Sequence, residues 1–463
     1  MKRIIRSALA VLFFLFIFRT QSVLASDKVV VVIDPGHGGY SEDASAYGAV
    51  YKDELCEKDV NLETAFALRD ELQRYNNVEV YLTREDDRRL SLEERVDFAL
   101  SVGADVLVSC HYNASETHLF YGSEIFTSAF GYCYSYGNGL AQCIMEQWID
   151  DGQASKGIKT RIGSTGEDYY GIIRHGCEVS LPVIIIEHGY LDNHVDYERL
   201  GTAGDWDRMG RLDATGIANY YGLSKEQVYD EVFPVVDVPI PDYVVEPDTS
   251  PPGYVYLRII DQNIETSEVV YELSAKESNG KLMYYGLCLG EPEETAPEDY
   301  GDLMLWEEGK SVITGTYSVP TGYRGKITAR VYNNYELYSD SAPQELDFAT
   351  LLEERAQLLE QAAKEAAAKA EERRQSLLKR DEEAKLEAER KKEREEVGDF
   401  FFFVGGDKKG DQVDPVKARR SLYLEIVALV VLIAVLVCII IIKHRKEIMK
   451  TIRNIEGNDW DRY

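Results

Sequence analysis

The chain has 463 residues, which is too long for one ordinary domain and predicts several segments of different character. Its formal charge of −30 excludes a nucleic-acid-binding protein, because such a protein needs a basic face. Its seven cysteines include no CxxC or CxxxC pair, which excludes a zinc ribbon and a dense disulfide framework. Buried free thiols are the simpler interpretation of these cysteines, and disulfides among the six outside the apolar run at 421–442 are the alternative, for which the sequence indicates no pairing.

Both ends of the chain carry targeting signals. Residues 1–25 combine basic residues, a short apolar core and a small-residue cleavage site, as in a secretory signal peptide. An uncleaved N-terminal anchor is the alternative. Residues 421–442 are almost entirely apolar and match the ~20 residues of a transmembrane helix. The basic tail at 443–463 predicts a cytoplasmic C-terminus, so we expect a single-pass protein of the cell membrane with its domains outside.

Residues 28–223 alternate between strand-like and helix-like segments. The apolar run VVVVI at 29–33 predicts a buried strand. Further strands are predicted at 78–83, 106–110, 123–127 and 182–186. Helices are predicted at 58–75, at 91–102 behind a capping box of Ser91 and Glu94, at 134–150 and at 206–221. This alternation predicts an α/β domain with a mixed, largely parallel sheet flanked by helices.

The rest of the chain divides into segments of distinct composition. Residues 224–252 are rich in proline and predict an extended, stiff spacer. Residues 253–347 contain short tyrosine-rich strands separated by turns, which predicts a small all-β, sandwich-like domain. Residues 350–397 contain helix formers with i,i+4 acid–base pairs, which predicts a long charged helical stalk. A second linker at 398–420 precedes the transmembrane segment.

The predicted stalk has too few large apolar residues for a convincing heptad seam. A single solvated helix is therefore the preferred interpretation. Self-association through a dimeric coiled coil is the alternative.

Four ionisable residues lie at the ends of predicted elements in the first domain. His37 follows the first strand after an Asp-Pro-Gly turn, Glu57 opens a helix, and His111 and Glu187 each end a strand. Ligands and metals bind at this rim of an open α/β sheet. Two imidazoles and one carboxylate form a catalytic zinc set, and a second carboxylate can transfer protons. Each residue alone is better explained as an ordinary rim residue, but the four together indicate a metal-dependent hydrolase.

Five separated motifs give the first domain a resemblance to a known family. They are VIDPGHGG at 32–39, EKDVNL at 57–62, LTR at 82–84, SCHYNA at 109–114 and PVIIIEHGYLDN at 182–193. On these motifs the domain resembles the zinc-dependent N-acetylmuramoyl-L-alanine amidases of the AmiC-like family, the type 3 amidase domain. The resemblance covers residues 29–221 and does not extend to the rest of the chain.

The resemblance implies a site and a reaction. His37, Glu57 and His111 would be the ligands of Zn²⁺, and Glu187 would be the catalytic acid–base. The implied reaction is hydrolysis of the amide between N-acetylmuramic acid and L-alanine of peptidoglycan by zinc-activated water. Glu54 lies three residues before Glu57, so the local sequence leaves the carboxylate ligand open, and the EKxxNL match favours Glu57.

Three further residues in or beside these motifs receive interpretations. Asn113 is either a support for His111 or a turn-forming residue. Arg84 is expected to be a structural ion-pair partner. His188 is expected to line the cleft beside Glu187, and the alternatives are that it binds the metal or forms hydrogen bonds.

Two other functions fit the same sequence. A catalytically idle wall-binding or scaffold protein would explain the large non-catalytic part of the chain. A zinc peptidase acting on a different amide would share the same metal site. In the leading interpretation the partners are peptidoglycan and, through the C-terminal anchor, the cell membrane, and the catalytic domain lies on the cell-wall side.

Overall fold

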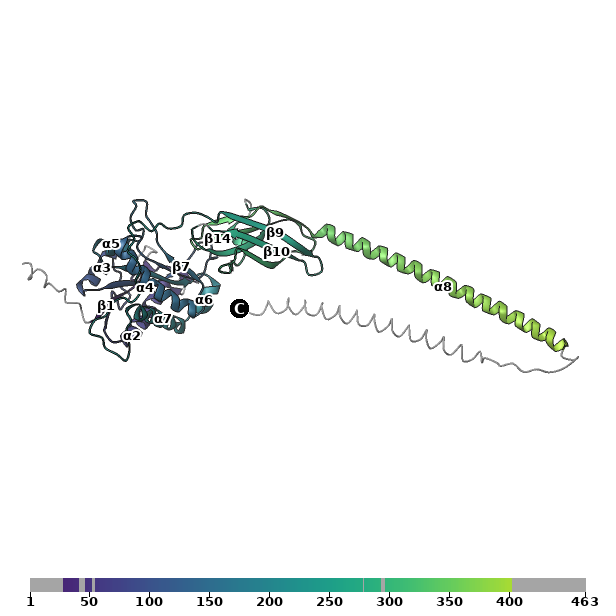
Figure 1. Ribbon diagram of the computed structural model, residues 1–463, viewed down its shortest axis with the longest axis horizontal. Coiled ribbons are helices and arrows are strands. Elements are labelled where there is room, and N and C mark those ends of the chain that lie inside the picture. Colours follow the sequence, from purple (N-terminus) through teal and green to yellow (C-terminus); the bar gives the residue numbers. More distant parts are fainter. Residues whose placement is uncertain (1–27, 41–45, 52–54, 278, 293–295, 402–463) are drawn as a thin grey trace, which may run out of the picture. The chain divides into compact units, whose positions relative to one another are not determined.

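The computed structural model describes residues 28–40, 46–51, 55–277, 279–292 and 296–401 (Figure 1). The predicted signal peptide at 1–25, the transmembrane segment at 421–442 and the tail at 443–463 lie outside these residues, as does the second linker beyond residue 401. None of the helices in the described ranges is long and apolar enough to cross a membrane. The chain forms one compact unit up to Glu360 and a second unit from Gln361.

A six-stranded sheet forms the centre of the first domain. Its order is β4 (Val78–Leu82), β1 (Val29–Pro35), β5 (Val106–Asn113), β8 (Val183–Tyr190), β6 (Ser123–Phe126) and β7 (Ser155–Lys159). The first four strands are parallel, whereas β6 pairs antiparallel with β8 and parallel with β7. The prediction of a mixed, largely parallel sheet is confirmed. Because parallel strands end at one edge, β1, β5 and β8 carry their last residues to the same rim.

Helices cover both faces of this sheet (Figure 1). One face packs against α2 (Glu57–Leu72), α4 (Gly131–Asp150) and α7 (Ala203–Tyr221), and the other against α3 (Leu92–Ser101) and α5 (Gly171–Glu178). Strand β1 alternates between the two cores, since Val31 and Ile33 join the first and Val32 the second. The predicted capping box of Ser91 and Glu94 is present at the start of α3.

Several short elements of this domain had no sequence prediction. They are β7, α5, the helix α6 (His194–Leu200) and the small hairpin of β2 (Val50–Tyr51) and β3 (Leu55–Cys56). The hairpin lies directly before α2, which begins with Glu57.

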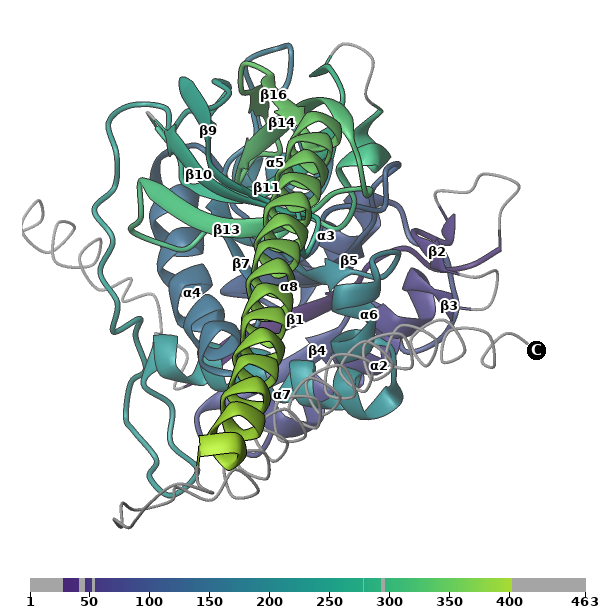
Figure 2. The ribbon, with the colours of Figure 1, turned by 90° about the vertical axis from the view of Figure 1, so that its right-hand side faces the viewer.

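The second domain consists of two antiparallel sheets (Figure 2). One contains β13 (Val312–Ser318), β10 (Glu268–Lys276) and β9 (Tyr254–Asn263). The other contains β12 (Met304–Leu305), β11 (Leu282–Leu289), β14 (Arg324–Asn333), β15 (Tyr338–Asp340) and β16 (Gln344–Asp347), with the short helix η3 (Pro297–Tyr300) beside it. Leu273 of the first sheet and Ile327 of the second belong to one buried core, so the two sheets form the expected sandwich-like domain. We call it the β-domain.

The proline-rich segment 224–252 is not the spacer that its composition predicts. It lies along the first domain, where Val235 N–H donates to Tyr220 O at 2.7 Å and Val245 N–H donates to Ala129 O at 3.0 Å. Valine side chains of the segment also pack against the core of the first domain. We call this segment the strap, because its backbone is fastened along the domain surface.

The strap ends where the β-domain docks onto the first domain. Aromatic and apolar side chains from both domains form one buried cluster there, comprising Phe120, Tyr121, Tyr190, Met283, Tyr284, Leu303 and Tyr332. The Tyr121 hydroxyl donates to the Leu303 carbonyl at 3.0 Å, which satisfies a polar group inside the cluster. The two domains therefore share an interface, whereas the sequence predicted that a spacer separates them.

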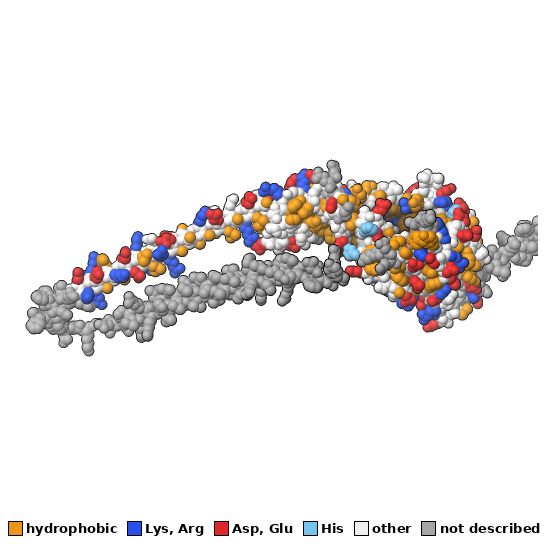
Figure 3. Space-filling model, turned by 180° about the vertical axis from the view of Figure 1, so that it is seen from behind, with side chains coloured by type: hydrophobic (Ala, Val, Ile, Leu, Met, Phe, Trp, Pro, Cys, Tyr) orange, Lys and Arg blue, Asp and Glu red, His pale blue; other side chains and the backbone are white. Residues whose placement is uncertain are grey.

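Helix α8 (Phe348–Phe401) follows β16 directly and covers the predicted stalk. Its 54 residues correspond to a length of about 80 Å. Acidic and basic side chains are distributed along it (Figure 3). Leucines such as Leu358 and Leu377 are exposed. This surface agrees with a solvated helix, and self-association through it stays a prediction.

A buried carboxylate beyond β8 makes a pH-dependent contribution to stability. Asp196 Oδ2 accepts the N–H groups of Tyr190 and Gly122, each at 2.7 Å. Burial raises the pKa of Asp196 to about 6, above the unfolded value of 3.8. Folding therefore favours the protonated form of Asp196. The ionised carboxylate lowers the free energy of unfolding, and this destabilisation is absent below pH 3.8 and complete above about pH 6.

We expect Asp196→Asn to remove this destabilisation. Relative to the variant, the wild type should lose about 3 kcal/mol of unfolding free energy between pH 3.5 and 6.5. Urea unfolding across this range measures the difference, and Asp207→Asn on the exposed face of α7 is the control. A difference between wild type and Asp196→Asn that stays constant with pH would contradict the prediction.

Candidate active site

The loop after β1 has an unusual backbone conformation at His37. His37 has a φ of 58°, and the two glycines that follow it, Gly38 and Gly39, have φ values of 118° and 78°. Glycine adopts such angles at little cost, whereas a residue with a Cβ does not. The tight turn predicted after the first strand is therefore present, but its most constrained non-glycine residue is the histidine itself.

Two buried arginines hold this loop through its backbone carbonyls. Arg84 donates from Nε to Pro35 O at 2.9 Å and from a terminal nitrogen to Gly36 O at 2.9 Å. Arg95 donates to Pro35 O at 3.0 Å and to His37 O at 2.7 Å. Three consecutive carbonyls are thus fixed by charged donors, which form stronger hydrogen bonds than neutral donors.

Asp34 supplies the negative charge for this arrangement. Its buried carboxylate accepts hydrogen bonds from Arg95 at 2.5 Å, Thr83 Oγ1 at 2.5 Å and Ser109 Oγ at 2.7 Å. Burial alone would raise the pKa of Asp34. Arg95 and the two hydroxyls lower it by more than burial raises it, so the pKa lies below its usual value. The ion pair expected for Arg84 is wrong: in the described part of the chain Arg84 bonds to carbonyls, and Arg95 makes the ion pair.

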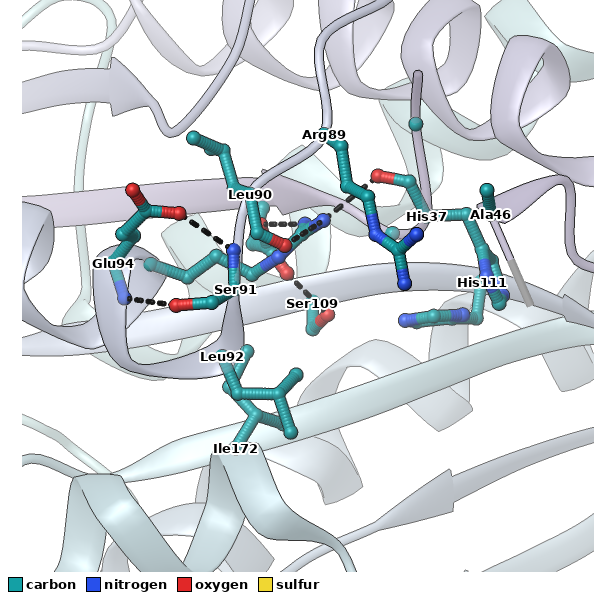
Figure 4. Close-up of a pocket in the computed structure, with 14 residues that line it drawn as sticks. His37, Ala46, Arg89, Leu90, Ser91, Leu92, Glu94, Ser109, His111 and Ile172 are labelled. Atoms are coloured by element: carbon teal, nitrogen blue, oxygen red, sulfur yellow. Dashed lines mark hydrogen bonds and ion pairs between the residues drawn. The ribbon is translucent and has the colours of Figure 1, made fainter. Parts of the chain in front are cut away.

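The structure brings His37, Glu57 and His111 together. One donor atom from each lies within 4.8 Å of the others. Glu57 lies between the two rings, with Oε2 at 3.2 Å from His37 Nε2 and Oε1 at 2.9 Å from His111 Nδ1. Figure 4 shows the two histidines at one end of a pocket of about 670 Å³, with Ser91 and Glu94 at the other end.

Backbone and side-chain donors orient the Glu57 carboxylate. Its oxygens accept Ala49 N–H at 2.8 Å, Tyr112 N–H at 3.1 Å and Asn61 Nδ2 at 3.3 Å. Burial raises the pKa of Glu57, but hydrogen bonds with His111 and His37 outweigh it and keep the carboxyl ionised. Asn61 was not singled out from the sequence, although the motif EKDVNL contains it. Glu54, the alternative carboxylate, lies outside the described residues.

The surroundings of these three residues fit a metal ion. A Cβ at Gly36 would lie 2.2 Å from the His111 ring, and a Cβ at Gly48 would lie 2.2 Å from Glu57 Oε2. The backbone therefore approaches the donor groups at positions where only glycine fits. Burial lowers the pKa of His111, which favours the neutral imidazole that metal binding requires. Two imidazoles and one carboxylate are the donors of many catalytic zinc sites.

Glu187 lies beside this cluster without belonging to it. On the parallel pair β5–β8, Glu187 is the register partner of His111, and on the antiparallel pair β6–β8 it faces Glu124. Its Oε2 is buried and has no hydrogen-bond partner within the described ranges. Burial first, and then the charges of Glu57 and Glu124, raise the pKa of Glu187 well above its usual value. A carboxyl with these properties can accept, carry and release a proton.

Two neighbours have different roles from those expected. Asn113 Nδ2 donates to Glu124 at 2.6 Å. Asn113 therefore holds the carboxylate that faces Glu187, whereas support of His111 was one of its two expected roles. His188 does not line the cleft, because its side chain points to the opposite face of β8 and is fully buried. Its ring contacts the His111 carbonyl at 3.0 Å and Asp213 of α7 at 2.8 Å.

The fold and the site together define an α/β domain with a metal-type donor cluster at the rim of its sheet and an acid–base carboxyl beside it. Comparison with known proteins agrees with this class. The sequence profile of the family described as N-acetylmuramoyl-L-alanine amidase matches residues 31–219. The N-acetylmuramoyl-L-alanine amidase CwlM of Bacillus licheniformis is 33% identical over 198 residues, covering 42% of this chain and 70% of that protein. The chain belongs to the N-acetylmuramoyl-L-alanine amidase family.

Other relatives match the same part of the chain. LytC, an N-acetylmuramoyl-L-alanine amidase of Bacillus subtilis, is 30% identical over 41% of this chain and 35% of its own length. Among solved structures, the catalytic domain of the amidase CwlV from Bacillus (Paenibacillus) polymyxa is 31% identical, with 42% of this chain and 97% of that chain covered and a TM-score of 0.35. From here on we call residues 28–223 the amidase domain.

The glycine beside Glu57 offers a test of the site geometry. Gly48 and Gly103 have nearly the same φ, 69° and 71°, but a Cβ at Gly103 would meet no atom within 4 Å. We expect Gly48→Ala to displace Glu57 and to weaken Zn²⁺ binding at least tenfold. Gly103→Ala introduces the same backbone strain, but we expect it to leave the affinity for Zn²⁺ unchanged. Titration calorimetry with Zn²⁺ measures both variants, and equal affinities would show that the close approach at Gly48 is unimportant.

Proposed function

We propose that the chain is a cell-wall hydrolase that cleaves the amide between N-acetylmuramic acid and L-alanine of peptidoglycan. The observation that supports it most directly is the convergence of His37, Glu57 and His111 at the rim of the sheet, with Glu187 adjacent. In this proposal the first three residues hold Zn²⁺ and Glu187 is the catalytic acid–base. Membership of the amidase family supplies the substrate class.

The proposed mechanism assigns one task to each group. Bound Zn²⁺ would polarise the scissile carbonyl and make water a better nucleophile at neutral pH. Glu187 takes the proton of the attacking water on its unpaired Oε2 and transfers it to the amine nitrogen as the C–N bond breaks. Glu124 faces Glu187 and is itself held by Lys159 and Asn113, so its charge helps to keep the proton on Glu187 until the amine leaves.

Removal of the acid–base separates catalysis from metal binding. We expect Glu187→Gln to lower kcat by 10²- to 10⁴-fold, because it removes proton transfer, while it retains bound Zn²⁺. His37→Ala should lose both activity and zinc, and a chelator should inactivate the wild type reversibly. Glu146→Gln, at an exposed position of α4, is the control. Release of free stem peptide from muropeptides, with metal content measured in parallel, checks these outcomes.

The same assay distinguishes the two alternative functions. A catalytically idle scaffold would bind insoluble wall without releasing peptide, and His37→Ala would not change that binding. A zinc peptidase would cleave sugar-free stem peptides as well as intact muropeptides. Wild-type protein that releases no stem peptide when Zn²⁺ is restored would overturn the amidase proposal.

We further propose that the protein acts on the cell-wall side of the membrane, with a secretory signal at 1–25, an anchor at 421–442 and the helix α8 as a stalk. The proposal rests on the composition of the two terminal segments. In intact cells, added protease should cleave α8 and release the amidase domain with the β-domain. A truncation after residue 397 should move the protein from the membrane fraction to the medium. Protection of α8 from protease in intact cells would contradict this placement.

A further inference from the structure

A second pocket, of about 470 Å³, lies on the Glu187 side of the site between the amidase domain and the β-domain. Three segments of the chain line it. Glu187, Arg161 and Tyr170 come from the amidase domain, Asp248 and Thr249 from the strap, and Tyr335, Glu336 and Leu337 from the turn between β14 and β15. We call it the interdomain pocket.

The β14–β15 turn is anchored in the amidase domain by buried polar contacts. The Glu336 carboxylate forms an ion pair with Lys156 and accepts a hydrogen bond from the Tyr190 hydroxyl. Asn334 Nδ2 donates to the Lys156 carbonyl at 3.1 Å. The Lys156 side chain is fully buried, and its second ion pair, with Glu124 at 3.8 Å, is longer, so the loss of Glu336 would weaken the pairing of a buried charge. The turn is therefore a fixed wall of the pocket.

The strap is fastened to both domains at the same place. On one side, Thr160 Oγ1 donates to Val245 O at 2.7 Å. On the other, Asn333 Nδ2 donates to Asp248 Oδ2 at 3.1 Å and to Ser250 O at 3.0 Å. The second wall of the pocket is thus as well ordered as the first.

Four carboxyls line the pocket, those of Glu124, Glu187, Asp248 and Glu336, together with the two cations Lys159 and Arg161. Glu336 pairs with Lys156, and Glu124 pairs with Lys159 and, at 3.8 Å, with Lys156. Arg161 is exposed, and no carboxylate of the described residues lies within ion-pair distance of it. Its guanidinium carbon lies 3.8 Å from the centroid of the Tyr169 ring and 5.8 Å from that of the Tyr170 ring, and the Tyr170 hydroxyl forms a hydrogen bond with the Arg161 side chain. A planar guanidinium held in this way suits a carboxylate, which it can bind through two parallel hydrogen bonds.

The position of Glu187 indicates which half of the substrate enters this pocket. In the proposed reaction Glu187 protonates the amine of the departing peptide, so that amine lies over Glu187. The two histidines line the other pocket, whose lining does not include Glu187 (Figure 4). The stem peptide carries free carboxylates, whereas the N-acetylated glycan on the acyl side of the amide is uncharged. The position of Glu187 therefore assigns the peptide to the interdomain pocket, where Arg161 can bind one of its carboxylates.

We propose that the interdomain pocket is the subsite for the stem peptide, in which Arg161 binds a peptide carboxylate and the β14–β15 turn forms the outer wall. This inference rests on the proposed amidase function and adds to it a role for the β-domain. In this view the β-domain shapes the substrate site directly.

A binding experiment tests the subsite without requiring turnover. The probes are the free stem peptide L-Ala–γ-D-Glu–L-Lys–D-Ala and the same peptide with its carboxyls amidated, titrated into the full-length protein. We expect Arg161→Gln to weaken binding of the first peptide about tenfold, as for loss of a charged hydrogen bond, and to leave the amidated peptide unaffected. Arg211→Gln, at an exposed position of α7, should change neither affinity. With muropeptide as substrate, Arg161→Gln should raise KM and leave kcat within about twofold.

Substitution of the wall gives an independent result. Leu337→Ala should weaken both peptides, by on the order of threefold, because it removes apolar contact that does not depend on charge. Leu305→Ala, at an exposed leucine of the same domain, is its control.

The outcomes separate this proposal from the proposed function. Equal binding of the free peptide by wild type and Arg161→Gln, or equal losses for the charged and the amidated peptide, would overturn the subsite even if the protein cleaves muropeptides. Unchanged binding in Leu337→Ala would overturn the role of the β-domain as a wall. Selective loss of the charged peptide in a protein that releases no stem peptide would support the subsite and refute the amidase activity.

Discussion

The site depends on how the carbonyl groups of the loop after β1 are held. Pro35, Gly36 and His37 turn their carbonyls toward two buried guanidinium groups, and Asp34 balances part of that charge. A guanidinium buried without such acceptors would be strongly unfavourable, so the loop and the two arginines stabilise each other. The left-handed conformation of His37 persists because this network over-determines it. The geometry of His37, the first candidate ligand, therefore depends on the sheet edge and on α3 as much as on the motif VIDPGHGG.

Much of the amidase domain could be predicted because its signals are local. Apolar runs gave the strands β1, β5 and β8, and the capping box of Ser91 and Glu94 gave the start of α3. Strand β7 was missed because its sequence, SKGIK, contains two lysines and only one large apolar residue. Both lysines are buried, and their carboxylate partners, Glu336 and Glu124, lie far away in the sequence. No window of neighbouring residues carries that information.

In the candidate site, too, the residues themselves could be predicted from local signals, but their surroundings could not. His37, Glu57, His111 and Glu187 could be chosen from strand ends and motifs, and the structure places them together. The environment of these residues could not be predicted, because it depends on the face of a strand that each side chain occupies and on distant elements. His188 follows Glu187 in sequence but points to α7, and the strap is fastened by backbone hydrogen bonds that composition does not reveal. Docking of the β-domain completes the interdomain pocket. This docking depends on the strap and on contacts between residues that are distant in the sequence.

The way α8 begins has a mechanical consequence. Its first residue, Phe348, is buried in the core of the β-domain, so tension applied along the helix enters the domain at β16. Strand β16 transmits that tension through its ladder to one end of β14, and the other end of β14 leads into the turn that walls the interdomain pocket. Tension applied along α8 and occupancy of the pocket would therefore act on a single strand.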